Sequence, residues 1–423
     1  MAELVNCIGC GLCSALSEKP LSYCKKTGTF NPFGSEKVEV AKYCPLLIDY
    51  KKLYREFYDS KLSVKQLGKT LDVAVTYSKN AVNRLNGASG GTITEIFSFL
   101  LRTSKVDAVI VAHQPQTGDF RDVHPKIITD SNELGSCSGS IYITVPMLRI
   151  LSSLDPTRRY AISLVPAQAA MLRRLQIDGN IQAKSIIFVA GLMTGTTLKP
   201  EAIDFLLQRK KMNSKNISFF KWRHGSWPGK LKIGFNDGRF FEQEKIYYNF
   251  LIPSFIAPHS LASHDFYNEF ADVCDGDAWD DELEKRKKGV SLLLTRTKLG
   301  HSVILKMVNK NLLEMTDITE EKASKMHSHM YEFKKRGSYI RTRINKNNLP
   351  FFKHGYDIIK ISKERIRIEK ILKLIFKIAG SRVYLLLLHI TPLNLVGFIF
   401  NVLRLNWKNK TQKIKRGSKV LLK

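Results

Sequence analysis

Three cysteines near the start of the chain constrain it more than any other feature. Cys7, Cys10 and Cys13 are spaced three residues apart, with a glycine on each side of Cys10. This spacing makes a tight loop whose thiolates converge, as in the C-x2-C-x2-C run that gives three ligands to a 4Fe-4S cluster. The fourth ligand in such sites is a cysteine followed by proline. Cys44 has that proline and the rival Cys24 lacks it, so we expect Cys44 to complete the site.

Three other interpretations of these cysteines stay open. A zinc site usually takes its cysteines from two separated pairs rather than three from one loop. Disulfides need an oxidising compartment, and residues 1–6 have neither the basic start nor the apolar stretch of a signal peptide. Chance clustering is the third, although four of the 7 cysteines lie at ligand spacing. The pattern favours the iron-sulfur cluster over zinc, and we expect a cytoplasmic protein.

The positive charge of the chain is concentrated in its last quarter. The formal net charge is +29, and residues 331–423 hold 23 Lys and Arg against 4 Asp and Glu, a net +19. An anionic partner would therefore bind this segment. Few aromatic residues interleave with its charges, so base stacking has little support, and nucleic acid is not an expected partner.

The rest of the chain indicates an α/β protein in three parts. Residues 1–60 form a ferredoxin-like cluster segment, 61–315 a central α/β domain, and 316–423 a basic helical tail. Strands alternate with helices from 71 to 191, which predicts a largely parallel sheet. The predicted strands are 72–77, 107–112, 160–165, 185–190 and 290–296, the helices are 46–58, 91–101, 145–154, 167–175 and 201–211, and turns are expected at 236–238 and 276–277.

A glycine-rich turn, residues 86–94, sits after a predicted strand and opens a predicted helix. Small residues there let backbone N–H groups approach a phosphate, and the helix start adds partial positive charge. Most glycine-rich turns are only turns, so the spacing alone is a weak signal. A second junction places Gln168 near the carboxyl end of a strand, where it could hydrogen-bond a cofactor ring. The alternative is that Pro166 merely starts a core helix.

Several short motifs then follow one another over residues 1–300. They are the cysteine run, Cys44-Pro45, Arg84 with Ser89-Gly90-Gly91 and Thr94, Pro166 with Gln168 and Arg173, Arg223 to Gly229, Ala271 to Trp279, and Ser291 to Gly300. In this order they resemble the beta subunit of the coenzyme factor 420 (deazaflavin) hydrogenases and dehydrogenases. Each motif alone is modest, but their collinear order is more specific.

The resemblance implies an oxidoreductase that passes electrons between one 4Fe-4S cluster and FAD. The flavin would exchange a hydride with a deazaflavin coenzyme or another organic substrate, and relatives of this single-cluster type also occur in bacterial surface-glycan pathways. A redox partner protein is implied as well. Cys7, Cys10, Cys13 and Cys44 would hold the cluster, and Arg84, Ser89, Gly90, Gly91, Thr94 and Gln168 would lie along the FAD-binding crevice of the central domain.

The chain departs from the family pattern at further cysteines. Relatives commonly have cysteine at the position of Ala167, after the next strand at 192–194, and as a pair where this chain has Ser263 and His264. Only Cys24, Cys137 and Cys274 are left over, so we expect one cluster rather than two. The same losses motivate an alternative, a catalytically degenerate scaffold or binding protein that keeps the fold.

The tail contains 21 residues without a formal charge, 383–403, long enough for a spanning helix. His389, Thr391-Pro392 and Asn394 interrupt it, which disfavours a clean span. The preceding run 358–378 is basic and amphipathic, a combination that suits an anionic membrane surface. Peripheral attachment to the inner membrane face is thus one expectation. Packing on the body or a partner, and a true span, are the others.

Overall fold

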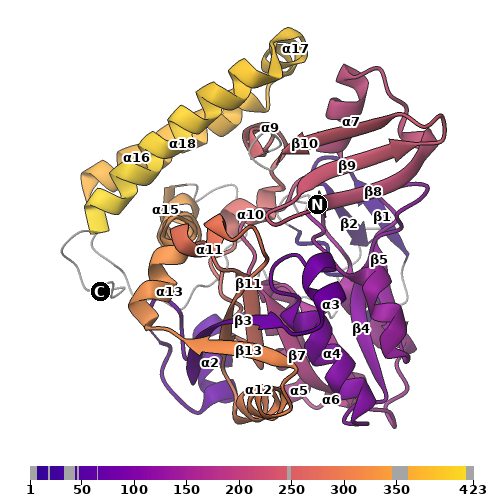
Figure 1. Ribbon diagram of the computed structural model, residues 1–423. Coiled ribbons are helices and arrows are strands. Elements are labelled where there is room, and N and C mark those ends of the chain that lie inside the picture. Colours follow the sequence, from indigo (N-terminus) through magenta and orange to yellow (C-terminus); the bar gives the residue numbers. More distant parts are fainter. Residues whose placement is uncertain are drawn as a thin grey trace.

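The structure is a computed structural model of the chain (Figure 1). It describes residues 7–17, 20–32, 43–44, 47–63, 65–244, 249–344 and 361–415.

An eight-stranded sheet forms the centre of the molecule (Figure 1). Helices pack on both of its faces, so the α/β class expected from the sequence is confirmed. The strands are β3 Asp72–Ser78, β4 Ala108–His113, β5 His124–Ile128, β6 Tyr160–Leu164, β7 Ile186–Leu192, β11 Val273–Asp277, β12 Ser291–Thr295 and β13 Leu313–Asp317, in the spatial order β13-β3-β12-β11-β7-β6-β4-β5.

The sheet is mixed, so the expectation of a largely parallel sheet holds only in part. The four strands predicted between 71 and 191, β3, β4, β6 and β7, run in one direction, whereas β5, β12 and β13 run the other way. Only the central pairs β4–β6, β6–β7 and β7–β11 are parallel. The pairs β4–β5, β11–β12, β12–β3 and β3–β13 are antiparallel. Parallel neighbours need long crossovers such as the α5 region between β6 and β7, whereas β11 and β12 are joined by a shorter return that allows the opposite direction. The turn expected at 276–277 is instead the paired end of β11.

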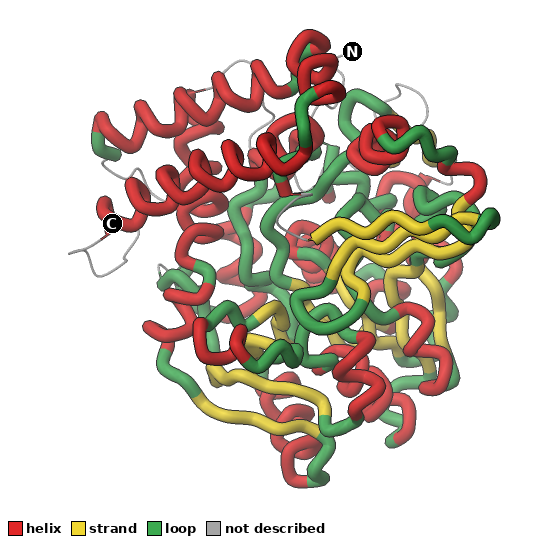
Figure 2. Tube along the Cα trace, turned by 45° about the horizontal axis from the view of Figure 1, so that its top comes forward, coloured by secondary structure: helices red, strands yellow, loops and turns green. Residues whose placement is uncertain are grey.

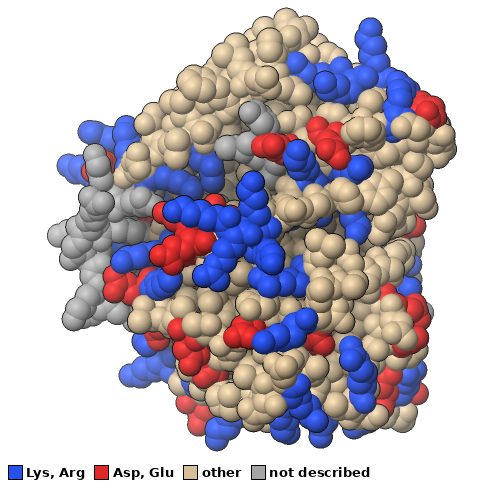
Figure 3. All heavy atoms as spheres, viewed as in Figure 1, with Lys and Arg blue, Asp and Glu red and all other residues tan. Residues whose placement is uncertain are grey.

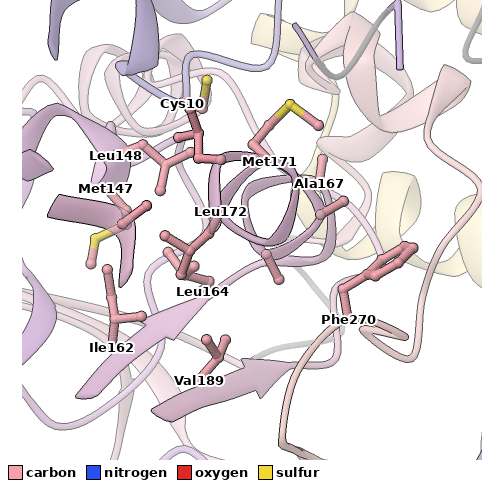
Figure 4. Close-up of a cluster of buried hydrophobic side chains, with 14 of the residues drawn as sticks. Cys10, Met147, Leu148, Ile162, Leu164, Ala167, Met171, Leu172, Val189 and Phe270 are labelled. Carbon is pink, nitrogen blue, oxygen red and sulfur yellow. The ribbon is translucent and has the colours of Figure 1, made fainter. Parts of the chain in front are cut away.

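Alternating side chains of the central strands pack into two separate cores, one on each face of the sheet. Ile110, Ile162 and Val189 belong to the first core and face one layer of helices. Val109 and Phe188 point to the opposite face and belong to another core. Figure 4 shows part of the first core, with Cys10 at its margin beside Leu148 and Met171. The first layer contains α1 Leu12–Ser17, α2 Tyr50–Tyr58, α5 Pro166–Ile177 and the 3-10 helix η3 Met147–Ser153, and the second contains α4 Thr92–Arg102 and α12 Lys298–Asn309.

Most predicted elements of this domain are present with shifted bounds. The helix expected over 145–154 is the shorter η3, since Pro146 precedes its first residue. The glycine-rich turn follows a short helix, α3 Ala81–Asn86, rather than a strand. Leu53 and Tyr54 of α2 are buried, as their helical spacing predicts, and the Asp49 carboxylate accepts a hydrogen bond from Lys52 N at 3.0 Å to begin that helix.

A second, smaller sheet packs beside the first. Its three strands are antiparallel in the order β10-β9-β8, and the predicted turn at 236–238 joins β9 to β10, with Gly238 at a φ of 81°. Positive φ favours glycine at this position. Aromatic residues such as Phe220 and Trp222 fill the core of this lobe. The elements are β8 Ile217–His224, β9 Lys230–Phe235, β10 Phe240–Glu244, α7 Glu201–Arg209 and α9 Ile252–Phe255.

The chain ends in helices, as expected of the basic tail. Three of them form a hairpin along one edge of the molecule, where the two long helices lie side by side in both ribbon views (Figures 1 and 2). No helix of the described tail or body is both long and apolar enough to cross a membrane. The elements are α13 Glu320–Met326, α14 Ser328–Tyr331, a π-helical turn Glu332–Arg336, α15 Gly337–Ile344, α16 Lys363–Ala379, α17 Arg382–Ile390 and α18 Leu393–Lys415.

Candidate iron-sulfur and cofactor sites

The cysteine loop has a backbone shape that only its glycines allow. Gly9 and Gly11 have φ values of 61° and 81°, in the left-handed region that favours glycine. A Cβ atom at Gly9 would lie 2.8 Å from Thr144 Cγ2, and one at Gly11 would lie 2.9 Å from Pro146 O. Both glycines are thus fixed by the packing of the loop against the body. The loop is therefore held in one shape, with Cys10 between two tight turns.

Of the four predicted ligands, Cys10 is buried and Cys7, Cys13 and Cys44 are half-buried. Burial raises the pKa of Cys7 to about 12, although Gly9 N donates a hydrogen bond to its Sγ at 3.4 Å and opposes that rise. The neighbouring thiols of Cys44 and Cys13 raise it further. Burial also raises the pKa of Cys10, and the thiols of Cys13, Cys7 and Cys44 add to the effect. Iron binding would have to displace these protons, since thiolates are the ligands.

The surroundings of the two rival fourth ligands differ. Cys13 and Cys44 pack against the first core, to which Cys10 belongs. Cys24 lies instead at the end of β1 Leu21–Cys24, in a hairpin with β2 Thr29–Pro32, and its thiol raises the pKa of Cys7 less than the thiols of Cys44 and Cys13 do. The packing of Cys44 against the same core as Cys10 and Cys13 thus favours Cys44.

In the part of the chain that the structure describes, no three His, Cys, Asp or Glu side chains are arranged to hold a single metal ion. In a cubane cluster each cysteine binds a different iron atom, so its four sulfurs lie farther apart than the ligands of one ion. A donor set of four thiols, with an N–H group donating to one sulfur, is one that either a 4Fe-4S cluster or a zinc ion can use.

The glycine-rich turn packs tightly against its own protein. A Cβ at Gly90 would lie 2.5 Å from Thr76 O, and one at Gly91 would collide with Asn83 O. Gly91 also begins α4 with a φ of 74°. Ser89 is buried, and its Oγ lies 2.6 Å from Ser291 Oγ. The small residues are therefore required by the approach of the turn to β3, β12 and α3, whether or not a phosphate binds there.

A buried carboxyl group lies beneath this turn. Asp275 on β11 is 7% exposed, and its Oδ2 accepts hydrogen bonds from Ser291 Oγ at 3.1 Å and Ser89 Oγ at 3.3 Å. Its Oδ1 is buried with no hydrogen-bond partner among the described residues. Burial raises the pKa of this carboxyl to about 7, against the lowering effect of the serine hydroxyls. The group is thus protonated over much of the acid range in the folded chain.

We expect Asp275→Asn to flatten the pH dependence of stability between about pH 4 and pH 7. A carboxyl group whose pKa is raised in the folded state binds more protons than in the unfolded state, so stability falls as pH rises through this window. At pH 8 the ionised, buried group costs on the order of 1–4 kcal/mol, which the amide avoids. Urea unfolding at pH 4.5, 6 and 8 measures the effect, with exposed Asp107→Asn as the control. A variant with the wild-type pH slope would contradict this assignment.

Gln168 lies where the sequence predicted, at the start of α5, but its amide group is already used. The side chain is 2% exposed, and Nε2 donates to Val145 O at 2.8 Å. Its Oε1 accepts a hydrogen bond from Val165 N at 3.5 Å, which caps the helix. Pro166 begins the same helix and is buried in the first layer. The core-helix interpretation thus accounts for both residues, and the contact of Gln168 with a cofactor ring stays a prediction.

Arg84 and Thr94 are the two predicted cofactor residues with partly exposed side chains. Arg84 Nε donates to Gly289 O at 2.9 Å, and its guanidinium carbon lies 3.6 Å from the centre of the Tyr77 ring. Thr94 Oγ1 lies 3.2 Å from Ser138 Oγ, at the wall of an open groove. The space in the groove that a water-sized molecule can occupy is only about 30 Å³, well below the size range of small-molecule sites.

The groove is lined mainly by polar residues from two lobes. Cys137 and Ser138 come from the main domain, while Lys221 and Arg223 come from β8. The Cys137 Sγ lies 3.4 Å from Nδ1 of His113. Sequence reasoning missed this groove because its two walls lie far apart in the chain. Hydrogen-bonding side chains and a lysine are suitable for a ligand that carries phosphate groups.

Asp277 and Asp272 belong to the sequence motifs but had no predicted role. Each of them connects separate motifs by hydrogen bonds. Asp277 accepts hydrogen bonds from both terminal nitrogens of Arg223, at 2.9 and 3.0 Å, and from Trp227 Nε1 at 2.7 Å. The Trp227 and Trp279 rings are 4.7 Å apart. The segment Arg223 to Gly229 is thereby fixed to the end of β11. The motifs that are separate in sequence form one framework around the groove wall.

Asp272 also connects separate segments of the chain, at a more buried position. It is 4% exposed, and its Oδ2 lies 2.8 Å from both Arg173 Nη2 and Val189 N. Its Oδ1 accepts a hydrogen bond from Thr297 Oγ1 at 2.7 Å. One carboxylate thus connects α5, β7 and the start of α12. These motif residues hold the fold together and lie away from any open surface.

Two family models match the chain over the region that contains these motifs. Residues 73–152 match the model of the N-terminal part of the coenzyme F420 hydrogenase/dehydrogenase beta subunit, and residues 157–321 match the model of its C-terminal part. Together they cover more than half of the 423 residues. The chain belongs to the coenzyme F420 hydrogenase/dehydrogenase beta subunit family. The resemblance inferred from the motif order is therefore confirmed, and this beta subunit family indicates an oxidoreductase. The cysteine loop and the last hundred residues lie outside both matched ranges.

A solved structure of this family's hydrogenase complexes has a similar fold. It is a chain of the xenon-derivatised F420-reducing [NiFe] hydrogenase complex from Methanosarcina barkeri, with 16% sequence identity and a TM-score of 0.53. The match covers 67% of this chain and 96% of that chain. At this identity the likeness concerns the fold alone.

Proposed function

We propose that this chain is an iron-sulfur flavoprotein oxidoreductase that passes electrons between one 4Fe-4S cluster and FAD. Cys7, Cys10, Cys13 and Cys44 would hold the cluster. The observation that carries the proposal is that Cys44, distant in the chain, packs on the same core as Cys10 and Cys13 of the loop. Such a cluster supplies single-electron transfer, and FAD supplies the change from single electrons to a hydride.

The groove beside Thr94 is the proposed place for FAD. Its polar lining and Lys221 suit the diphosphate, and Ser138, which lies beside Thr94, contributes a hydroxyl at its wall. The two walls would have to move apart to admit the cofactor. Arg84, Ser89, Gly90 and Gly91 border the same turn, and their contribution would be to hold α4 in place against β3 and β12. Gln168 would act by capping α5, one layer below.

The proposed substrate is a deazaflavin coenzyme or another organic hydride acceptor, with surface-glycan biosynthesis as one setting. Membership in the coenzyme F420 family supports the first, and the missing family cysteines leave room for the second. A redox partner protein is part of the proposal, since a single cluster needs an external electron donor or acceptor. The multi-subunit nature of the similar hydrogenase complex supports such a partner.

Purification under anaerobic conditions tests this proposal. We expect a coloured protein with about four iron atoms and one FAD per chain, the stoichiometry of one 4Fe-4S centre in a flavoprotein. Iron analysis and the absorbance spectrum before and after dithionite reduction measure both. A colourless protein after reconstitution with iron, sulfide and FAD would overturn the proposal.

A catalytically degenerate scaffold is the second candidate. The observation that favours it is the packing of the glycine-rich turn, whose glycines are explained by contacts within the chain. The two candidates differ in one measurement. A chain that binds iron and FAD but is not reduced by dithionite, or whose reduced flavin transfers no electrons to deazaflavin or quinone-type acceptors, would be a scaffold.

A further inference from the structure

The helical hairpin formed by α16, α17 and α18 exposes an unusual amount of apolar surface. In the described chain 25 large apolar side chains are exposed, and 13 of them lie between residues 371 and 405. Figure 3 shows the result as a broad area without charged side chains over the hairpin. Single exposed apolar residues are ordinary, but a contiguous area of this kind marks an interaction surface.

These residues recur at intervals of three and four. Ile371, Leu374 and Ile378 of α16 are each more than half exposed, and so are Leu386 and Ile390 of α17, at 71% and 76%. This is the spacing that places side chains on one face of a helix, the pattern that normally faces a protein core. Here that face is turned to solvent, so each helix carries an apolar stripe that the body leaves uncovered.

The opposite side of the hairpin is the one attached to the body. Glu369 of α16 is buried and lies 2.9 Å from Arg341 Nη1 of α15 and 2.6 Å from Arg365 Nη1. Leu388 of α17 and Val396 of α18 are buried in the core of the smaller lobe. Arg209 of α7 also donates hydrogen bonds to the carbonyl oxygens of Leu388 and Thr391. These contacts fix which side faces outward.

Basic residues border the exposed stripe. Lys370 and Lys377 each precede an isoleucine of the stripe by one residue, so they lie about 100° around the helix from it. Lys373 and Arg382 are exposed on the same segment, and Glu369, the nearest acid, is buried. An apolar stripe with a cationic border is the pattern of helices that lie in the interface of an anionic bilayer.

We propose that the face of α16, α17 and α18 marked by Ile371, Ile378, Leu386, Ile390 and Phe398 docks on an anionic lipid surface. The stripe would enter the headgroup region, and the bordering lysines and arginine would contact the lipid phosphates. A second copy of the chain is the poorer occupant, because a symmetric contact would bring Lys370 and Lys377 of both copies together. This inference is independent of the proposed redox function.

Vesicle co-sedimentation of the purified full chain tests the proposal. The vesicles contain either phosphatidylcholine alone or phosphatidylcholine with phosphatidylglycerol. We expect binding to the anionic vesicles that weakens as salt rises. Leu386→Glu should lower that binding at least about tenfold, since it removes an apolar side chain that would enter the bilayer and adds a negative charge that the anionic lipids repel. Charge reversal of Lys370 and Lys377 together should weaken binding to the anionic vesicles selectively.

Phe240→Glu is the matched control, because Phe240 is 62% exposed on strand β10, outside the hairpin. It should bind vesicles as the wild type does, and thermal midpoints should show that all variants fold. Absence of binding to either vesicle, or binding unchanged in Leu386→Glu, would overturn the proposal. Self-association in light scattering that Leu386→Glu abolishes, without vesicle binding, would assign the face to a second copy and would overturn it as well.

Discussion

Cys44→Ser is expected to abolish the iron-sulfur cluster, whereas Cys24→Ser should leave it intact. Cys44 packs with Cys13 against the core that contains Cys10, and its thiol influences the pKa of both Cys7 and Cys10. Serine is a far poorer iron ligand than thiolate, so the loss of one of four ligands should reduce bound iron several-fold. Iron and sulfide analysis of anaerobically reconstituted protein, with the absorbance near the visible cluster bands, measures the change.

Cys24→Ser is the most informative control, because Cys24 is the other candidate for the fourth ligand. Its backbone carbonyl accepts hydrogen bonds from Thr27 N and Gly28 N in the β1–β2 turn, so the residue has a structural position that serine can keep. Cys137→Ser, far from the loop in the groove wall, provides a second control. If Cys44→Ser kept the cluster and Cys24→Ser lost it, Cys24 rather than Cys44 would be the fourth ligand. Retention in both would contradict the four-thiol site.

The sequence predicted the elements of the fold better than their arrangement. Period-two and helical spacing identified β3, β6, α5 and α7 within a few residues, because burial of one face sets those patterns. The direction of β12 relative to its neighbours was missed, since hydrophobic alternation carries no information about which neighbour a strand will pair with. The strands β5 and β13 were not predicted. The Gly276-Asp277 pair looked like a turn and is a strand end, because its pairing with β12 outweighs local preference.

Candidate site residues were predicted by type and less well by role. The cysteine loop is short, so its spacing alone implied that the thiols converge, and their role as cluster ligands stays a prediction. The glycine-rich turn and Gln168 were assigned to a cofactor from their position at helix starts. Their glycine contacts and amide hydrogen bonds lie within the protein, and many of these depend on partners distant in the chain. Such contacts become visible only when the fold brings β12 and the Val145 segment beside them.

The same long-range contacts explain why Asp272→Ala is expected to be strongly destabilising. The Asp272 carboxylate meets the buried Arg173 side chain at 2.8 Å, and its two oxygens also accept from Val189 N and Thr297 Oγ1. Removing it leaves a buried guanidinium without this counter-charge, and breaking a buried ion pair in this way costs about 3–5 kcal/mol. The free energy of unfolding from urea titration at pH 7 measures the loss. Asp107→Ala, which breaks an exposed pair with Arg159, should change it little.

A double variant at Arg173 and Asp272 separates two contributions to the loss of stability, that of the unpaired Arg173 charge and that of the lost hydrogen bonds. Arg173→Met combined with Asp272→Ala removes both charges, so it should be more stable than Asp272→Ala alone although it carries one more substitution. The remaining deficit relative to wild type would then come from Val189 N and Thr297 Oγ1, which lose their acceptor in both variants. A double variant less stable than the single one would show instead that Arg173 stabilises the fold through its bond to Phe270 O, at 2.9 Å, and its packing on the Phe57 ring.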